Sequence, residues 1–206
     1  MPIRDEIKPK RFASINRALT CVVVLALSLP ILWAQAEHHE PSPVPGYQNA
    51  QLGFRYRPPH EMHDKTDSSA AVLEDQARNL HTESRLQLLL SMSSGPDDRA
   101  AGWHSLTIVA CPRDAFSQLD DVSAEAKMSF WVGGASGSNP GPARSVLISG
   151  QTFSVFVFAV QLDGVRKGSV VWTTIRDGKL LSFAFAANSP EQLKALAETM
   201  KTVQFY

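Results

Sequence analysis

Cysteine is scarce in this sequence, and neither sign of charge is in excess. Only two of the 206 residues are cysteine, Cys21 and Cys111, so the chain lacks the several disulfides that stabilise many small exported domains. Its 20 basic and 20 acidic residues balance. Proteins that bind nucleic acid or an anionic membrane surface usually carry a basic excess, so we expect neither as the main partner.

The motifs of common catalytic sites are also missing. The sequence has no Gly-x-Ser-x-Gly elbow, and the Gly133-Gly134 loop lacks the Gly-Lys-Ser/Thr ending of a phosphate-binding loop. A cysteine nucleophile needs a histidine base within hydrogen-bond reach. His104 precedes Cys111 by seven residues, which is about 23 Å if both lie on one strand. We therefore expect Cys111 to be a small apolar residue at a strand end, and the glycine loop to be a flexible connector.

The first 36 residues have the three parts of an export signal. A basic region precedes an almost wholly apolar run from Ala18 to Trp33, and Ala34-Gln35-Ala36 has the small-x-small pattern of a cleavage site. The basic residues are Lys8, Lys10, Arg11 and Arg17. The sequence predicts a signal peptide over residues 1–36 and a secreted or periplasmic protein. The alternative is a segment retained as a membrane anchor. The apolar run is shorter than the roughly 20 residues that usually span a membrane, which favours cleavage.

Cleavage after Ala36 changes the composition of the chain. The remaining 170 residues carry 15 basic and 18 acidic side chains, a net charge of −3, and Cys111 is their one cysteine. That length is enough for one domain with its own hydrophobic core, which must supply the stability that disulfides do not. Residues 37–46 are polar and rich in proline, and we expect them to form a flexible tether.

Cleavage at this position would also create a candidate metal site. A mature chain that begins Glu37-His38-His39 offers its amine, two backbone amides and the His39 imidazole in one plane. Square-planar nitrogen ligation suits Cu²⁺ or Ni²⁺. The alternative is a disordered terminus that binds these metals only adventitiously, and we expect no other cofactor.

A second group of candidate metal ligands follows a pair of prolines. His60, His63 and Asp64 form a His-x-x-His-Asp cluster in a predicted loop. Structural Zn²⁺ sites normally take four ligands, so the alternative is a set of solvated polar side chains.

Residues 144–206 contain the clearest structural pattern. Two-residue turn signals stand at Gly150-Gln151, Asp163-Gly164 and Asp177-Gly178, and such pairs suit the tight turns of β-hairpins. They predict four antiparallel strands with a defined register. Across the first turn, Val146 is predicted to pair with Val155. Across the second, Val155 pairs with Trp172 and Val157 with Val170. Across the third, Trp172 pairs with Phe183 and Val170 with Phe185.

This register sorts the side chains onto two faces. One face is strongly apolar and carries Ile148, Phe153, Val155, Val157, Val170, Trp172, Leu181, Phe183 and Phe185. The other face is mixed and carries Leu147, Ser154, Phe156, Phe158, Val171, Thr173, Ile175, Leu180, Ser182 and Ala184. An antiparallel sheet with one face in water alternates more cleanly. We therefore expect helices on at least one side and partial cover on the other.

A helix and a last strand follow these four strands. In Ser189-Pro190-Glu191-Gln192, the serine suits an N-cap, the proline the first helical position, and the glutamine a capping box. The apolar stripe of this helix is Leu193, Leu196, Ala197 and Met200. Val203 and Phe205 predict a short strand that returns to the sheet.

The residues before the four strands alternate between strand and helix patterns. Strands are predicted over residues 47–56, 85–92 and 106–110, and a helix over residues 117–131. A further helix is predicted after a cap at Asp67, Ser68 or Ser69, with an apolar stripe of Val72, Leu73, Ala77 and Leu80. The order of elements predicts an α+β fold, with a mostly antiparallel β-sheet flanked by helices, in a single domain over residues 47–206.

The segment from Tyr47 to Pro59 resembles the opening of PsbP-like domains, where an N-x-x-x-G-F-x-x-x-x-P pattern starts the first hairpin. Asn49, Gly53, Phe54 and Pro59 occupy its fixed positions. The later strands, helix and last strand are similar in layout, so the resemblance covers residues 47–206. It implies an α/β/α sandwich that acts as an accessory or binding subunit, in a family whose partners include a photosystem and a small GTPase. The tryptophan that often follows the proline is absent here.

Together these patterns predict an exported binding or accessory protein, without catalysis, that acts on a protein partner in the cell envelope. The alternative is a hydrolase-type enzyme or a metal-binding protein that uses the loop of His60, His63 and Asp64. An exposed apolar surface would favour the first hypothesis, and a deep pocket with converging histidine and carboxylate groups would favour the second. We expect contact with a membrane only if the signal segment is retained.

Overall fold

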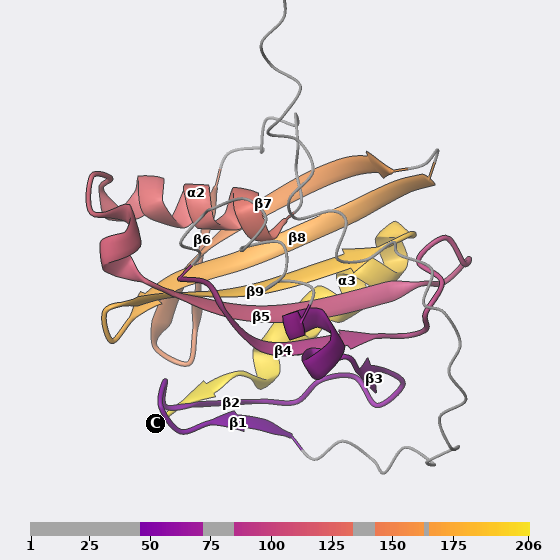
Figure 1. Ribbon diagram of the computed structural model, residues 1–206, viewed down its shortest axis with the longest axis horizontal. Coiled ribbons are helices and arrows are strands. Elements are labelled where there is room, and N and C mark those ends of the chain that lie inside the picture. The colour runs from indigo at the N-terminus through magenta and orange to yellow at the C-terminus, as the bar shows by residue number, and fades with distance from the viewer. Residues whose placement is uncertain (1–45, 72–84, 134–142, 163–164) are drawn as a thin grey trace, which may run out of the picture.

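The computed structural model describes residues 46–71, 85–133, 143–162 and 165–206. A seven-stranded antiparallel sheet in the order β3-β4-β5-β9-β8-β7-β6 forms its centre (Figure 1). Its strands are β3 (His63–Asp64), β4 (Gln87–Ser93), β5 (His104–Pro112), β6 (Arg144–Ile148), β7 (Gln151–Leu162), β8 (Val165–Arg176) and β9 (Lys179–Ala187). A second sheet has the order β1-β2-β10. Its strands are β1 (Tyr47–Asn49), β2 (Phe54–Tyr56) and β10 (Gln204–Phe205).

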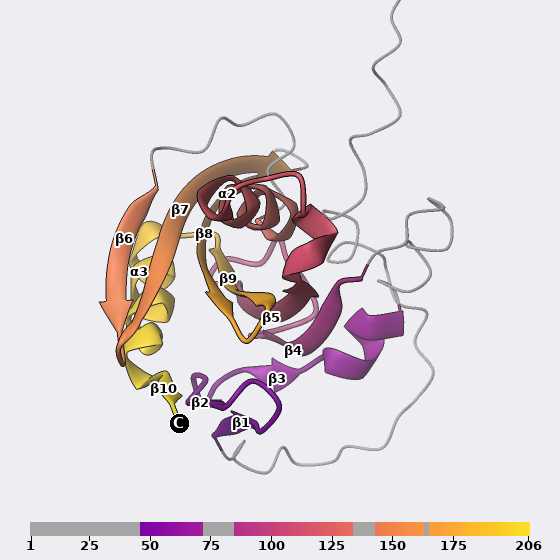
Figure 2. The same ribbon diagram turned by 90° about the vertical axis from the view of Figure 1, so that its left-hand side faces the viewer.

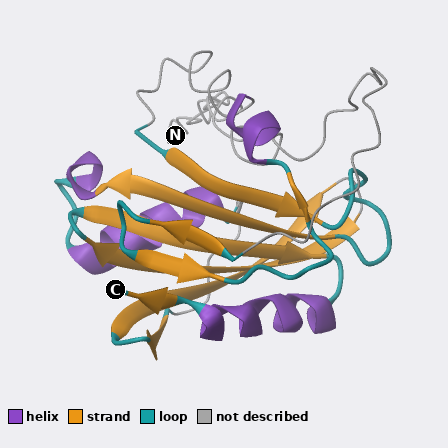
Figure 3. Ribbon diagram, turned by 90° about the horizontal axis from the view of Figure 1, so that it is seen from below, coloured by secondary structure: helices purple, strands orange, loops and turns teal. Residues whose placement is uncertain are grey.

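Helices cover both faces of the seven-stranded sheet. α2 (Asp121–Val132) packs on β7, β8 and β9 from one side, and α3 (Pro190–Glu198) packs on β5, β8 and β9 from the other. Figure 2 shows the two helices on opposite sides of the curved strands β7 and β8, and α3 runs along the strands in Figure 3. The predicted α+β fold with a mostly antiparallel sheet flanked by helices is confirmed.

The predicted pairing of the last three long strands is also confirmed. Val157 lies opposite Val170, and Trp172 lies opposite Phe183. Asp177 and Gly178 both have positive φ, 50° and 71°, as a type I′ hairpin turn requires. The turn at residues 163–164 falls outside the described residues, although β7 and β8 pair on either side of it.

The first predicted turn is wrong by one residue. Its central residues are Ser149 and Gly150, with φ of 48° and 79°, so Val146 lies opposite Phe153 and not opposite Val155. The partner of each β6 residue is thus shifted by two positions along β7. Because side chains alternate with a period of two, every side chain stays on its predicted face. Ser149 stands at a position where glycine or asparagine is more usual, and its hydroxyl donates a hydrogen bond to the carbonyl of Val203, at 2.7 Å.

Side chains on the α3 side of the sheet form the main core. From the predicted apolar face, Ile148, Phe153, Val155, Val170, Leu181, Phe183 and Phe185 are buried there. Trp172 is partly buried against this core. Val157 is 58% exposed, because β6 begins opposite Val155 and does not extend alongside Val157. On the opposite face, α2 covers Phe156, Phe158, Val171, Leu180 and Ala184. Both faces therefore have the cover that their composition predicts.

Capping explains where the helices begin. The Ser189 hydroxyl accepts a hydrogen bond from the backbone N–H of Gln192, at 3.2 Å, and Pro190 is the first helical residue. The predicted capping box is wrong, because the Gln192 side chain donates to the carbonyl of Gly102 instead, at 2.9 Å. α2 begins four residues later than predicted. A 3₁₀ helix over Arg113–Phe116 precedes α2, and the Asp120 side chain caps the N-terminus of α2.

Three other predictions need correction. Residues 47–56 form the hairpin of β1 and β2 and not one strand, with Gly53 at φ 57° in the turn. β10 pairs with β2, so the last strand joins the small sheet and not the large one. Residues 66–71 are helical, so that helix begins before its predicted caps, and its predicted stripe at Val72, Leu73, Ala77 and Leu80 lies outside the described residues. Within the described ranges, no helix has both the length and the apolar character to cross a membrane.

Candidate functional site

The structure does not gather the His60, His63 and Asp64 side chains into a site. His60 is exposed in the turn before β3, and His63 and Asp64 are neighbours on that short strand. Successive side chains of a strand point to opposite faces, so these two diverge. Asp64 accepts a hydrogen bond from the backbone N–H of Thr66, at 2.8 Å. No group of three or more metal-ligating side chains occurs among the residues that the structure describes.

Two other predicted features fall outside the described ranges. Glu37, His38 and His39 precede residue 46, so the copper or nickel site remains a prediction. The glycine- and serine-rich loop is described only up to Gly133.

Cys111 and His104 occupy the two ends of β5, as their spacing predicts. The Cys111 thiol is buried in the core beneath α2, where burial raises its pKa and keeps it protonated. The His104 Nδ1 lies 2.9 Å from the carbonyl of Gly102. Cys111 is therefore an apolar packing residue.

The one buried ion pair among the described residues lies at an end of the seven-stranded sheet. The Lys167 ammonium donates to the Asp98 carboxylate, and each residue is only 7% exposed. The same ammonium lies over the ring of Trp103, 4.7 Å from its centroid. Lys167 belongs to β8, whereas Asp98 and Trp103 belong to the loop between β4 and β5. The pair ties this loop to the sheet.

Two amide side chains attach the same loop to α3 and to the segment that precedes it. The Asn188 Nδ2 donates to the carbonyls of Asp98 and Ala100, at 3.0 and 2.9 Å, and Gln192 donates to Gly102. The Asn188 Oδ1 and Gln192 Oε1 atoms are buried and have no hydrogen-bond partner. Because every donor in this cluster is directed at a loop carbonyl or at Asp98, the cluster acts as a fastening between the loop, β8 and α3.

A row of polar side chains lies beneath α2. The Ser154 hydroxyl donates to the Glu125 carboxylate at 2.5 Å, and the Thr173 hydroxyl lies 2.7 Å from those of Ser129 and Ser182. Partial burial raises the pKa of Glu125, and the hydrogen bond from Ser154 opposes that shift. These hydrogen bonds satisfy the polar groups beneath α2 and fix the position of the helix across the sheet.

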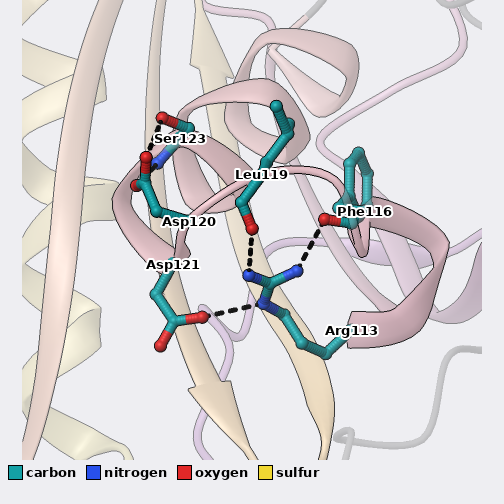
Figure 4. Close-up of polar contacts among 6 residues, drawn as sticks. All are labelled: Arg113, Phe116, Leu119, Asp120, Asp121 and Ser123. Carbon is teal, nitrogen blue, oxygen red and sulfur yellow. Dashed lines mark hydrogen bonds and ion pairs between the residues drawn. The ribbon is translucent and has the colours of Figure 1, made fainter.

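Arg113 fixes the segment that leads into α2 (Figure 4). Its guanidinium donates to the Asp121 carboxylate at 2.8 Å, and to the carbonyls of Phe116 and Leu119 at 2.8 and 2.6 Å. Asp120 accepts hydrogen bonds from the backbone N–H and hydroxyl of Ser123, which lower its pKa. These contacts hold the first turn of α2 and present Leu119 at the surface.

Large apolar side chains are exposed on and around α2 and on the adjacent strands β6 and β7. Among the described residues, six are more than a third exposed, namely Leu119, Val122, Trp131, Leu147, Val157 and Tyr206. The first three belong to α2 or to the segment before it, and the next two belong to β6 and β7. Only Tyr206 lies elsewhere, next to the small sheet. Exposed apolar side chains that form a patch mark a partner contact, and the four on the α2 side, Leu119, Val122, Trp131 and Leu147, are the candidates for one.

β6 is the last strand of the seven-stranded sheet. Within the described part of the chain, it pairs only with β7. Arg144, Ser145 and Leu147 are exposed on it, Leu147 to 69%. An unpaired strand edge is a template for another strand.

Neither a scan against protein-family models nor a search of curated proteins finds a match to this sequence. Among solved structures, that of cyanobacterial PsbP (CyanoP) from Synechocystis sp. PCC 6803 matches with a TM-score of 0.50. The two are 12% identical, and the match covers 84% of this chain and 98% of that one. The chain has a PsbP-like fold. This confirms the resemblance that the Tyr47–Pro59 segment indicates.

Two further solved structures are less similar to this chain than CyanoP is. A protein from Bacteroides thetaiotaomicron matches with a TM-score of 0.41 and 14% identity, over 75% of this chain and 45% of that one. LpqN of Mycobacterium tuberculosis, which is involved in cell envelope biogenesis, matches with a TM-score of 0.36 and 11% identity, over 58% of this chain and 78% of that one. The chain thus spans less than half the length of the Bacteroides protein.

Proposed function

We propose that this chain is an exported binding or accessory protein that acts, without catalysis, on a protein partner in the cell envelope. The observation that carries the proposal is the placement of the exposed apolar side chains. Four of the six named above lie on the α2 side of the sheet, namely Leu119, Val122, Trp131 and Leu147, whereas Val157 lies on the opposite face. Protein interfaces are enriched in aromatic and apolar anchors of this kind.

The polar clusters are consistent with this proposal. Lys167, Asp98 and Arg113 are engaged in fastening one backbone segment to another. The partly buried carboxyl of Glu125 accepts a hydrogen bond from Ser154 on β7 and so helps to hold α2 on the sheet. These groups maintain a rigid scaffold, on which α2 and the outer strands present their apolar side chains.

Export follows from the N-terminal pattern. The basic region, apolar run and Ala34-Gln35-Ala36 site favour cleavage after Ala36 and release of the mature chain outside the cytoplasm. A net charge of −3 in that mature chain suits a protein partner better than an anionic surface. N-terminal sequencing of the exported protein tests this part, and a mature terminus other than Glu37 would contradict it.

Co-purification from the native envelope tests the binding function. The tagged chain is crosslinked in intact cells, and its partners are compared with those of a Trp131→Ser, Leu147→Ser double variant. We expect the variant to lose most of the captured partner, because both side chains are exposed. Trp131 also packs on Phe116, so a wild-type circular dichroism spectrum must show that the variant is folded. Tyr206→Ser is the matched control, because it removes an apolar side chain of similar exposure at the small sheet. Equal capture by all three proteins would contradict the proposal.

A further inference from the structure

We propose that the outer edge of β6 receives an extended segment of the partner, which adds to the sheet as a further antiparallel strand. The inference rests on the proposed function and names the part of the surface and the kind of segment involved. Peptides bound in this way gain affinity from main-chain hydrogen bonds and specificity from alternate side chains.

Within the described part of the chain, backbone groups on the outer side of β6 have no strand partner. Ile148 and Gln151 flank the two-residue turn and form a hydrogen-bonded pair, and hydrogen-bonded and non-hydrogen-bonded pairs alternate along an antiparallel ladder. The N–H and C=O groups of Ser145 and Leu147 therefore point away from β7, toward the outer edge. Both residues are exposed. An incoming strand can pair with four backbone groups there without displacing any described strand.

The side chains along this edge differ between its two faces. Ser145 and Leu147 lie on the face that α2 covers, because they pair with Ser154 and Thr152. Arg144 and Val146 lie on the opposite face with the main core, against which Val146 packs. β6 lies beyond the strands on which α2 packs, so Leu147 has open space beside it. A cross-strand neighbour with an apolar side chain would bury that surface.

Arg144 supplies the charge that selects the partner. Its side chain is exposed at the start of β6, and it forms no ion pair with any residue in the described ranges. A carboxylate directly opposite Arg144 on an added strand would pair with it, whereas a like charge there would repel it.

These positions define a short recognition pattern. On an antiparallel strand, the residues opposite Leu147, Val146, Ser145 and Arg144 follow one another in that order. The geometry therefore fits an extended segment that reads apolar, apolar, small or polar, acidic. The acidic and the first apolar side chains fall on opposite faces because they are three residues apart.

A pair of peptides tests the inference on the intact mature chain. One capped peptide contains Leu-Val-Ser-Glu flanked by threonine and lysine, and in the other lysine replaces the glutamate. We expect the glutamate peptide to bind at least tenfold more tightly, and to slow hydrogen exchange at the amides of Ser145 and Leu147. No saturable binding up to millimolar peptide, or protection confined to other amides, would overturn the inference.

Three variants separate edge pairing from other binding. Ser145→Pro removes an outward N–H and keeps the ladder with β7, so we expect at least a tenfold loss of affinity, whereas Ser145→Ala should bind like the wild type. Arg144→Glu should reverse the preference between the two peptides. Retention of wild-type hydrogen exchange in β8 and β9 shows that each variant is folded. Equal binding by Ser145→Pro and Ser145→Ala would count against the inference.

Other outcomes distinguish the occupant of the edge and the function itself. If Ser145 and Leu147 become protected as protein concentration rises without peptide, a second copy occupies the edge and the inference is wrong. If Ser145→Pro still captures the envelope partner as well as the wild type does, the inference fails and the proposed function stands. If the wild type captures no partner at all, the proposed function fails as well.

Discussion

Lys167 and Asp98 are the two buried charged residues of the described part of the chain. Each neutralises the other, and the Trp103 ring adds a cation–π contact to the ammonium. A buried pair of this kind adds little net stability relative to apolar residues, but removal of one partner leaves an uncompensated charge in a poorly solvated position. The stability of the loop between β4 and β5 therefore depends on both residues being present.

Replacement of one partner should destabilise the protein strongly. For Lys167→Met we expect the free energy of unfolding to fall by about 3–5 kcal/mol, because the Asp98 carboxylate remains buried without its cation. The double variant Lys167→Met, Asp98→Ala should lose less than the sum of the two single variants. Urea unfolding of the four proteins measures this coupling. Additive losses would show that the two side chains do not interact in solution.

Glu125 should make stability depend on pH in the acidic to neutral range. Its pKa is raised above the ordinary value of 4.5, so the folded chain holds the proton more tightly than the unfolded chain does. The contribution of this group to stability is thus complete below pH 4.5 and falls as the pH rises through the folded-state pKa. Relative to Glu125→Gln, we expect the wild-type free energy of unfolding to decline with rising pH above about 4.5.

A second variant checks the cause of that decline. Ser154→Ala removes the hydrogen bond that favours the ionised carboxylate, so the decline with pH should become steeper. Urea unfolding at a series of pH values gives both profiles. Parallel profiles for the wild type and Glu125→Gln would mean that the carboxyl is no harder to ionise in the folded protein than in the unfolded one.

Neither of these clusters is predictable from the sequence. Lys167 and Asp98 are 69 residues apart, and their contact depends on how one loop lies across the end of the sheet. Glu125 meets Ser154 only because α2 crosses β7 at that point. Local pattern identifies strands and helices, but it contains no information on such long-range side-chain contacts.

At the scale of single elements, backbone sterics determine which residues fit the turns. Gly178 has φ 71° in the turn between β8 and β9, whereas Gly95 has no positive φ, and a Cβ atom at either position would meet nothing within 4 Å. The two glycines therefore differ in backbone conformation and not in available space. Left-handed backbone costs an L-residue roughly 1–2 kcal/mol.

That difference predicts opposite results for the same substitution. Gly178→Ala should lower the free energy of unfolding by about 1–2 kcal/mol through backbone strain. Gly95→Ala should leave it unchanged or raise it by up to about 1 kcal/mol, because alanine restricts the unfolded chain. Urea unfolding compares the two variants, and an equal effect of both would contradict the assigned turn.

The elements themselves are largely predictable, and the exceptions have physical causes. Register follows from the alternation of apolar side chains, and so the faces are correct even where the turn at Ser149 is misplaced by one residue. The Ser149 hydroxyl donates to the carbonyl of Val203, a residue distant in sequence, and local pattern does not reveal such a contact at the turn. Likewise, Gln192 leaves its expected capping role because a loop carbonyl lies within its reach.

At the scale of the whole molecule, the fold class and the PsbP-like layout are predictable, but the small sheet and the functional surface are not. β10 pairs with β2, which lies near the other end of the described sequence. Local pattern does not specify a partner so distant in sequence. The exposed apolar side chains cannot be distinguished from core residues in the sequence, because Leu147 and Val157 occupy core-type positions in apolar strands. Their exposure follows from where α2 and β6 end.

Site-specific crosslinking tests the central claim most directly. A photo-crosslinking amino acid replaces Leu147 or Trp131 in one set of cells, and the exposed Glu191 on α3 in a control set. If the chain is an accessory protein that binds an envelope partner through α2 and the outer strands, positions 147 and 131 will yield the same crosslinked protein and position 191 will not. Crosslinks of equal yield from position 191, or none from positions 147 and 131, would contradict the account.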